Sequence, residues 1–282
     1  MSKAVWDLLA PERLTEVVDI GANPCDGGNP PYKPMLDAAV CHVTGFEPQE
    51  RALAALQRKK GPNERYLPYA VGDGNTHTLY IYRGTGMASL LELDPAALAM
   101  FDVLQPLGEV VHRLPVSTRR LDDIAEVQRV DFLKIDIQGS ELLVLQNGSA
   151  RLAQAVAVQV EVSFVAIYKN QPCLGAIDLE MRSQGFIPHC FAGLKKCPLA
   201  PWAINGDPRR PSKQLLEADI VYVRDFLRPE SMSDEQLKHL ALIAHYCYGS
   251  VDLALRCMTL LVQRKALGSD TVSRYLAIAA KR

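Results

Sequence analysis

Residues 16–23 read EVVDIGAN, an apolar run that ends at a glycine and an asparagine. Such a run is typical of a buried strand that enters a tight turn. Gly21 lets the backbone approach a ligand closely, because glycine has no Cβ. Residues 16–23 therefore predict the first strand and the first turn of a nucleotide-binding sheet.

Predicted strands and helices alternate after this first strand. Strands are expected at residues 40–46, 66–71, 110–116, 132–137, 156–162, 186–191 and 218–223, with an extra edge strand or hairpin at 78–82. Helices are expected at residues 35–39, 49–60, 94–104, 121–127, 141–152 and 176–184. This alternation predicts an α/β fold with a mostly parallel, doubly wound, Rossmann-like sheet in residues 1–228.

The last segment, residues 229–282, is predicted to be helical. Helices are expected at residues 233–246, 250–265 and 269–280. Ser233, with Gln236 three residues later, forms a capping-box pattern at the start of the first of them. We interpret this segment as a small C-terminal helical appendage that serves packing or a homodimer contact rather than a substrate lid.

The composition excludes several classes of protein. Hydrophobic residues make up 48% and charged residues 22% of the 282 residues, which excludes wholesale disorder and a collagen-like chain. The formal charge of -1 means that the chain has no overall positive charge that would attract nucleic acid or an anionic membrane. No apolar run approaches the length of about 18 residues that spans a bilayer. The seven cysteines form no CxxC pair, so reduced thiols and no metal site are expected. These features predict a cytoplasmic protein with no nucleic-acid or membrane partner.

Carboxylates stand at the ends of nearly all the buried predicted strands. They are Asp19, Glu47, Asp73, Asp136 and Glu161. A carboxylate at such a place is costly to desolvate unless it has a partner or borders a wet cleft. In an open α/β sheet, ligands bind outside the carboxyl ends of the strands, where the strand order reverses. A single carboxylate of this kind is often a satisfied structural group, whereas the series favours a binding site.

The position of Glu47 favours a nucleoside ligand. An acid at the end of the second strand, about 20–30 residues after the glycine turn, can accept both ribose hydroxyls. Dinucleotide oxidoreductases and methyltransferases that use S-adenosylmethionine share this arrangement. The GxGxxG fingerprint is absent, because Pro24 and Cys25 stand where a pyrophosphate loop needs glycine. S-adenosylmethionine is therefore favoured over a nicotinamide cofactor.

Four motifs in order carry a resemblance to a known family. They are VDIGAN at 18–23, GFEP at 45–48, RLDD at 120–123 and DFLKIDIQGSE at 131–141. Together they resemble the successive motifs of the FkbM family of methyltransferases, over about residues 17 to 223. The resemblance implies a seven-stranded methyltransferase sheet whose last strand is antiparallel. It also implies S-adenosylmethionine as the donor and a hydroxyl of a sugar or natural product as the acceptor.

The resemblance also implies roles for individual residues. Asp19, Gly21 and Asn23 match the motif near the methionine part of the donor. Glu47 matches the ribose-binding acid, and Asp136 matches the acid at the floor of the transfer site. Further donor contacts are predicted at neighbouring strand-end residues, which are Ala22, Pro48, Gly72, Asp73 and Ile137.

The chain departs from the family pattern at two positions. Cys25 stands where the family turn usually has a glycine, and Gln138 stands where the family usually has a glutamate. The first substitution changes the cofactor loop, and the second removes a charge beside Asp136.

An alcohol acceptor must lose a proton during methyl transfer, so a base within hydrogen-bond reach is expected. The candidates, in order, are Asp136, Glu161 and His189. Tyr168 and Gln171 follow the strand that carries Glu161, and they are predicted to orient substrate hydroxyls.

Three functional classes remain open from the residues and the resemblance. The first is an S-adenosylmethionine-dependent O-methyltransferase that acts on a sugar, a glycan or a small natural product. The second is a nicotinamide-dependent oxidoreductase, which the missing glycines disfavour. The third is a non-catalytic nucleoside-binding module of the same fold, for which Cys25 and Gln138 are the argument.

Overall fold

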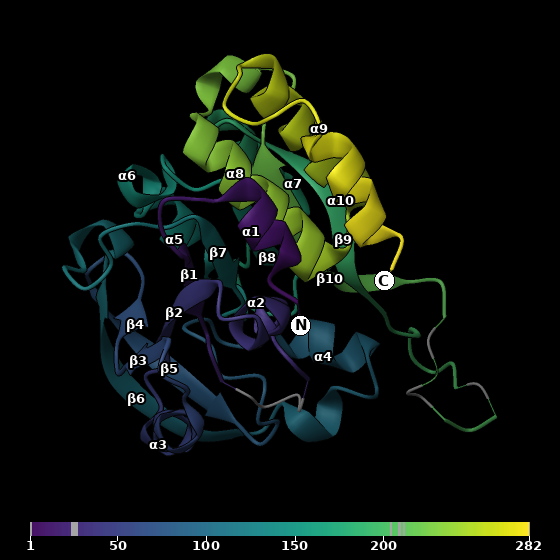
Figure 1. Cartoon of the computed structure of the whole chain (residues 1–282). Helices are drawn as coiled ribbons and strands as arrows, with labels where there is room; N and C mark the ends of the chain where they lie inside the picture. Colours follow the sequence, from purple (N-terminus) through teal and green to yellow (C-terminus); the bar gives the residue numbers. More distant parts are fainter. Residues whose placement is uncertain (1, 24–27, 204, 208–209, 211, 282) are drawn as a thin grey trace.

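The computed structural model describes residues 2–23, 28–203, 205–207, 210 and 212–281. Within these residues, the main sheet has seven strands in the order β3-β2-β1-β7-β8-β10-β9 (Figure 1). Their bounds are β1 Thr15–Ile20, β2 Cys41–Phe46, β3 Glu64–Leu67, β7 Phe132–Ile135, β8 Ala157–Ser163, β9 Phe186–Lys196 and β10 Leu215–Arg224. The first five are parallel, whereas β10 runs antiparallel to both β8 and β9. The predicted seven-stranded sheet with an antiparallel last strand is confirmed.

A second, three-stranded sheet lies beside the main one. It consists of β4 (Ala70–Val71), β6 (Val110–Arg119) and β5 (Thr76–Tyr82), in that order. The single strand predicted at residues 66–71 is wrong, because β3 ends at Leu67 and β4 pairs with β6 instead. Pro68 separates the two strands, and proline has no backbone N–H to continue a ladder.

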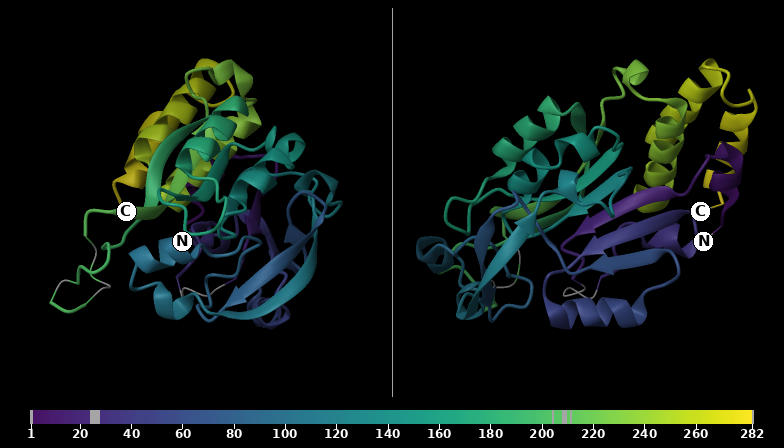
Figure 2. Two further views of the ribbon diagram at one scale, coloured as in Figure 1. Left: turned by 180° about the vertical axis from the view of Figure 1, so that it is seen from behind. Right: turned by 90° about the vertical axis from the view of Figure 1, so that its left-hand side faces the viewer.

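Helices cover both faces of the main sheet (Figure 2). One face carries α1 Ala4–Leu9, α2 Lys33–Asp37, α8 Asp234–Ile243, α9 Val251–Gln263 and α10 Thr271–Ala279. The other carries α5 Glu141–Gln146, α6 Ser149–Leu152 and α7 Leu174–Ser183. Two further helices are α3 Glu50–Lys59, beside β3, and α4 Pro95–Met100. The helix predicted at residues 121–127 is reduced to a 3-10 turn, Leu121–Asp123, and other 3-10 turns lie at Gln105–Leu107 and Pro229–Ser231.

The C-terminal segment packs directly on the sheet. Leu240 of α8 and Leu261 of α9 are buried in one core with Val17 of β1 and Phe132 of β7. The capping box at the start of α8 is confirmed, since the Ser233 side chain accepts from the backbone of residue 236 and the reciprocal bond is also present. After α8 the chain continues as a π-helix, Ala244–Tyr248. A homodimer through these helices stays a prediction. In the described part of the chain, no helix has the length and apolar character needed to cross a bilayer.

The parallel register arranges the face under the C-terminal helices in rows. Each row takes one residue from each of β1, β7 and β8, and each lies two residues nearer the carboxyl ends than the row before. Two rows lie within the strands, first Val17, Phe132 and Ala157, then Asp19, Lys134 and Gln159. Gly21 and Asp136 directly follow β1 and β7, and with Glu161 of β8 they form the edge beyond these rows. The sheet face therefore changes from apolar, to ionic, to an acidic edge.

Candidate active site

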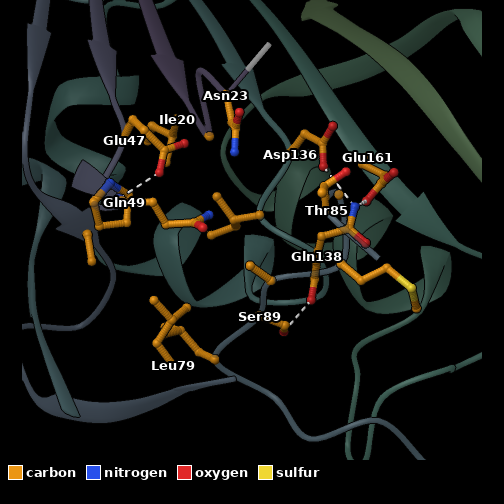
Figure 3. A pocket seen from close by; sticks show the side chains of 18 of the residues that line it. Ile20, Asn23, Glu47, Gln49, Leu79, Thr85, Ser89, Asp136, Gln138 and Glu161 are labelled. Atoms are coloured by element: carbon orange, nitrogen blue, oxygen red, sulfur yellow. Dashed lines mark hydrogen bonds between the residues drawn. The ribbon is translucent and has the colours of Figure 1, made fainter. Parts of the chain in front are cut away.

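A pocket of about 380 Å³ opens at this acidic edge (Figure 3). It lies where β1 has β2 on one side and β7 on the other, which is the point where the strand order reverses. Glu47 lies on one side of the pocket and Asp136 and Glu161 on the other, with Asn23 between them. Phe46, Tyr69, Val71 and Leu79 contribute apolar wall.

The turn after β1 brings its backbone against β7. Gly21 has φ +83°, and a Cβ at this position would lie 1.9 Å from the carbonyl oxygen of Asp136. The backbone N–H groups of Gly21 and Ala22 both donate to the carbonyl oxygen of Phe46. Glycine is required here because of both the left-handed backbone and the close approach. The turn continues through Asn23, which lines the pocket, whereas Cys25 lies outside the described residues.

Glu47 is a buried carboxylate that lines the pocket. Its side chain is 2% exposed, and its Oε1 accepts a hydrogen bond of 2.7 Å from the backbone N–H of Gln49. Burial, together with the charge of Asp19, raises the pKa of Glu47 to about 7, although the Gln49 hydrogen bond lowers it. A carboxylate offers about four acceptor positions, so Glu47 retains capacity for two hydroxyl donors.

Asp19 lies one layer below the pocket. Its Oδ2 accepts from the Tyr32 hydroxyl at 2.6 Å, and its Oδ1 lies 3.5 Å from the Lys134 ammonium. The same ammonium lies 3.8 Å from Asp136 Oδ2 and donates to the carbonyl oxygen of Gly21. Burial lowers the pKa of Lys134, but the charges of Asp19 and Asp136 outweigh it and raise this pKa above the usual value. Lys134 is therefore a buried cation that supports both aspartates.

Three carboxylates gather at the far side of the pocket. Oxygens of Asp136, Glu141 and Glu161 all lie within 4.8 Å of one another. The Gln138 amide nitrogen donates to Asp136 Oδ1 at 3.1 Å and to Glu161 Oε2 at 2.7 Å (Figure 3). Glu141 accepts from the backbone N–H groups of Ile137 and Gly139. Carboxylates at this spacing could ligate a divalent cation. The backbone N–H groups of Ile137 and Gly139 already stabilise the Glu141 carboxylate by hydrogen bonds. The expected lack of a metal stays a prediction.

The acidic surroundings alter proton affinity in this cluster. Burial raises the pKa of Glu161 well above its usual value, and the charges of Asp136 and Glu217 add to this effect. Burial also raises the pKa of Glu141 to about 7, although its backbone hydrogen bonds lower it. Carboxyl groups with shifted pKa values beside a pocket are typical of sites that bind ligands or transfer protons.

Comparison with known proteins agrees with this geometry. A model of the family described as "Methyltransferase FkbM domain" matches residues 19–188, which is more than half of the chain. The chain belongs to the FkbM methyltransferase family. It is also 28% identical over 169 residues to the 2-O-methyltransferase NoeI of Sinorhizobium fredii (strain NBRC 101917 / NGR234), covering 57% of this chain and 68% of NoeI.

Solved methyltransferase structures are similar only at a low level. Magnesium protoporphyrin IX methyltransferase (ChlM) from Synechocystis PCC 6803, with bound SAM, has a TM-score of 0.38 and 12% identity over 79% of this chain and 77% of its own. Precorrin-6y C5,15-methyltransferase from Geobacter metallireducens GS-15 has a TM-score of 0.37 and 10% identity over 78% of this chain and 86% of its own. The strand order, rather than these scores, defines the fold.

Three of the four FkbM motifs contribute lining residues, whereas RLDD at 120–123 does not, since its Asp122 accepts from backbone N–H groups at the start of α6. Not every predicted site residue lines the pocket. Gly21, Asn23, Glu47, Pro48, Asp136, Ile137 and Glu161 do. Ala22 is buried beside the turn, and Asp19 lies beneath it. Gly72 and Asp73 belong to the turn before β5, where Asp73 bonds to His77 and Asn75. The small sheet contributes Val71 of β4 and Leu79 of β5 to the pocket, but the turn between these two strands does not line it.

His189 lies away from the carboxylates that it was predicted to join. Its Nε2 lies 2.9 Å from Ser250 Oγ, at the start of α9, and burial lowers its pKa. The pocket is lined at the other end of β9 by Lys195. Six residues of strand separate the two side chains by roughly 20 Å.

Tyr168 and Gln171 lie behind the pocket wall. The Tyr168 hydroxyl is 3.1 Å from both the Met87 carbonyl oxygen and Gln138 Oε1. Gln171 accepts from the backbone N–H of Ile167, a lining residue, and donates to Ser163. Both side chains support residues that face the pocket.

The residues between β5 and α4 were not predicted to take part. Residues 84–90 line the pocket, and Ser89 Oγ donates to the carbonyl oxygen of Gln138 at 2.6 Å. The only local signal is the pair Gly84 and Gly86 after a strand, which is weak. Two other residues that were not predicted had a stronger signal in the sequence. Gln49 directly follows the GFEP motif, and Lys134 lies inside the last motif.

Proposed function

We propose that this FkbM-family methyltransferase transfers the methyl group of S-adenosylmethionine to a hydroxyl of a sugar, a glycan or a small natural product. The observation that carries the proposal is one continuous pocket with two chemically different sides. Buried Glu47 lies on one side, and the pair Asp136 and Glu161 lies on the other.

The Glu47 side fits a nucleoside. Glu47 has acceptor positions for two vicinal hydroxyls, and Phe46, Tyr69 and Leu79 offer apolar surface for a flat base. The close turn at Gly21 places backbone, rather than a side chain, at the pocket floor. A pyrophosphate would need the glycine-rich loop that this chain lacks, so these features favour S-adenosylmethionine over a nicotinamide cofactor.

The opposite side fits a hydroxyl acceptor. Bound S-adenosylmethionine would supply a methyl group on a sulfonium, whose C–S electron pair leaves with sulfur as the new C–O bond forms. The chain must then hold the acceptor oxygen in line and accept its proton. Asp136 suits that role, because its carboxylate lines the pocket beside Glu161, with the Lys134 ammonium 3.8 Å from its Oδ2. The relative named 2-O-methyltransferase supports oxygen as the acceptor atom.

Calorimetry tests the donor side directly. We expect S-adenosylmethionine to bind and NAD to give no heat. The Glu47→Gln variant should bind the donor at least about 10-fold more weakly, because a hydrogen bond to a charged group contributes about 1.5–3 kcal/mol. Binding of NAD with no binding of S-adenosylmethionine would overturn the donor assignment.

Transfer of a tritiated methyl group tests the acceptor side. Candidate acceptors are monosaccharides, oligosaccharides and hydroxylated aromatic compounds, with mass spectrometry to locate the methyl ether. Asp73→Asn is the matched control for Asp136→Asn, since both aspartates follow strands but Asp73 bonds within a turn of the small sheet. Equal losses in the two variants would contradict the proposed site, and a methylated nitrogen in the product would contradict O-methyl transfer.

A further inference from the structure

Tyr69 is an aromatic residue of the pocket wall that belongs to neither of the strands beside it. β3 ends at Leu67 and β4 begins at Ala70, so Pro68 and Tyr69 form the connection between the two sheets. Tyr69 lines the pocket together with Phe46, the last residue of β2. The orientation of the Tyr69 ring therefore depends on side-chain contacts rather than on a strand ladder.

Three contacts hold this ring. Its centroid lies 6.3 Å from that of Phe46, with 29° between the two ring planes. The Tyr69 hydroxyl donates to Glu126 Oε1 at 3.0 Å, and the Arg119 guanidinium carbon lies 3.7 Å from the ring centroid. A guanidinium at this distance over an aromatic face makes a cation–π contact. The ring thus has a carboxylate at its hydroxyl and a cation over one face.

Arg119 contacts the ring from behind, as seen from the pocket. Tyr69 lines the pocket, whereas Arg119 does not, and the Arg119 side chain is exposed. The strand β6 fixes its place, because Arg119 pairs with Val71 of β4 and its carbonyl oxygen accepts from the Gly72 backbone N–H. The small sheet therefore puts a cation behind a ring that faces the pocket.

A cation in this place affects how a flat base stacks on the ring. The faces of aromatic rings carry negative charge, which disfavours a full face-to-face stack of two rings. A guanidinium behind one of the rings offsets this repulsion by attracting the charge of its face. Stacking of a base on an aromatic side chain contributes roughly 5- to 100-fold in affinity, so a change in the ring's support is measurable.

We propose that Arg119 is a positioning residue for the donor. It holds the Tyr69 ring and offsets the charge of its face, so that the adenine of S-adenosylmethionine stacks on Tyr69. Arg119 acts through the ring and touches no part of the donor. The small sheet then has a defined task, since Val71, Leu79 and the supported Tyr69 form one side of the base site. This role rests on the proposed donor, but not on the acceptor or on the acids across the pocket.

The sign of the effect separates this role from simple electrostatics. S-adenosylmethionine has a net positive charge, because its sulfonium and ammonium groups outnumber its carboxylate. If long-range charge alone mattered, removal of a nearby cation would strengthen its binding. Loss of the cation behind Tyr69 should weaken binding instead. It should also weaken the binding of S-adenosylhomocysteine, which has no net charge, by the same factor.

Calorimetry with these two ligands tests the proposal. We expect Arg119→Gln to weaken the binding of both by about 3- to 5-fold, and Arg119→Lys, which keeps a cation, to recover most of the loss. Tyr69→Leu should weaken both by about 10-fold or more. Arg113→Gln is the matched control, because Arg113 is also in β6 and lies 5.7 Å from the Tyr80 ring centroid, but neither residue lines the pocket. This control should leave both affinities unchanged.

A double-mutant cycle tests whether Arg119 acts through the ring. In the Tyr69→Leu background, Arg119→Gln should change either affinity by less than about 2-fold. Equal effects in the two backgrounds, tighter binding of S-adenosylmethionine by Arg119→Gln, or no recovery with lysine would each overturn the proposal. If Tyr69→Leu fails to fold, the comparison of glutamine and lysine at position 119 decides the outcome.

The wild type separates this role from the proposed function. A wild type that binds neither ligand refutes the proposed donor and this role with it. A wild type that binds both ligands, with unchanged affinities in Arg119→Gln, overturns the role of Arg119 alone.

Discussion

The Glu47→Gln substitution is expected to stabilise the free protein at pH 8 while it weakens donor binding. Glu47 is 2% exposed, and its pKa is raised from 4.5 to about 7. The glutamine Oε1 can still accept from the Gln49 backbone N–H, so the local hydrogen bond is preserved. The substitution thus removes a buried charge with little change of shape.

The magnitude follows from the difference in proton binding. A carboxyl with a raised folded pKa binds more protons in the folded state, so its contribution falls as pH rises from 4.5 to 7. Each pH unit of pKa difference corresponds to about 1.36 kcal/mol, which makes the cost at pH 8 about 3 kcal/mol. At pH 5 most of that cost is absent, so the Glu47→Gln variant should then have an advantage of only about 1 kcal/mol.

Urea denaturation at pH 5 and pH 8, without and with donor, measures both effects. Without donor, the midpoint difference between variant and wild type should widen by about 1 M from pH 5 to pH 8, for an m value of about 2–3 kcal/mol/M. Donor at about 100 times its Kd should stabilise the wild type by about 2.7 kcal/mol and the variant much less. A variant whose stability follows the wild type at both pH values would refute the burial argument, and equal stabilisation by donor would refute the ribose contact.

Three further substitutions test separate parts of the structure. Asp136→Asn should slow methyl transfer by about 100-fold or more and leave donor affinity nearly unchanged, as kinetics and calorimetry would show. Gly21→Ala should destabilise the fold by about 3 kcal/mol or more, visible as a lowered Tm, because its Cβ would meet a carbonyl oxygen at 1.9 Å in a left-handed turn. Ser233→Ala should cost about 1 kcal/mol in urea denaturation through loss of the capping box, with no change in transfer rate.

The sheet and one side of the site could be predicted from local sequence. Apolar runs such as 16–20 and 132–135 predict buried strands because they are short, rich in β-branched or aromatic residues and followed by turn residues. Their ends meet at one edge in a parallel sheet, so Glu47, Asp136 and Glu161 could be placed together before their contacts were known.

The remaining contacts depend on geometry that local patterns do not contain. Pro68 divides one apolar run between two sheets, and Asp73, in the turn after β4, does not line the pocket although Val71 does. His189 is far from the carboxylates because β9 extends to Lys196, which puts the pocket at its other end. The closeness of Ser89 to Gln138 spans 49 residues, and no periodicity within either segment specifies it.

The rows of the sheet explain why the C-terminal segment affects the site. The ionic row of Asp19, Lys134 and Gln159 lies directly beneath the acidic edge, so water that reached it would screen the Lys134 charge from Asp136. Tyr248, which follows α8, donates to Gln159 at 2.9 Å and covers one end of this row, while Tyr32 covers the other at Asp19. The C-terminal segment, which has no pocket-lining residue among its described positions, therefore contributes to the site by covering the row of the sheet that holds Lys134 beneath the pocket.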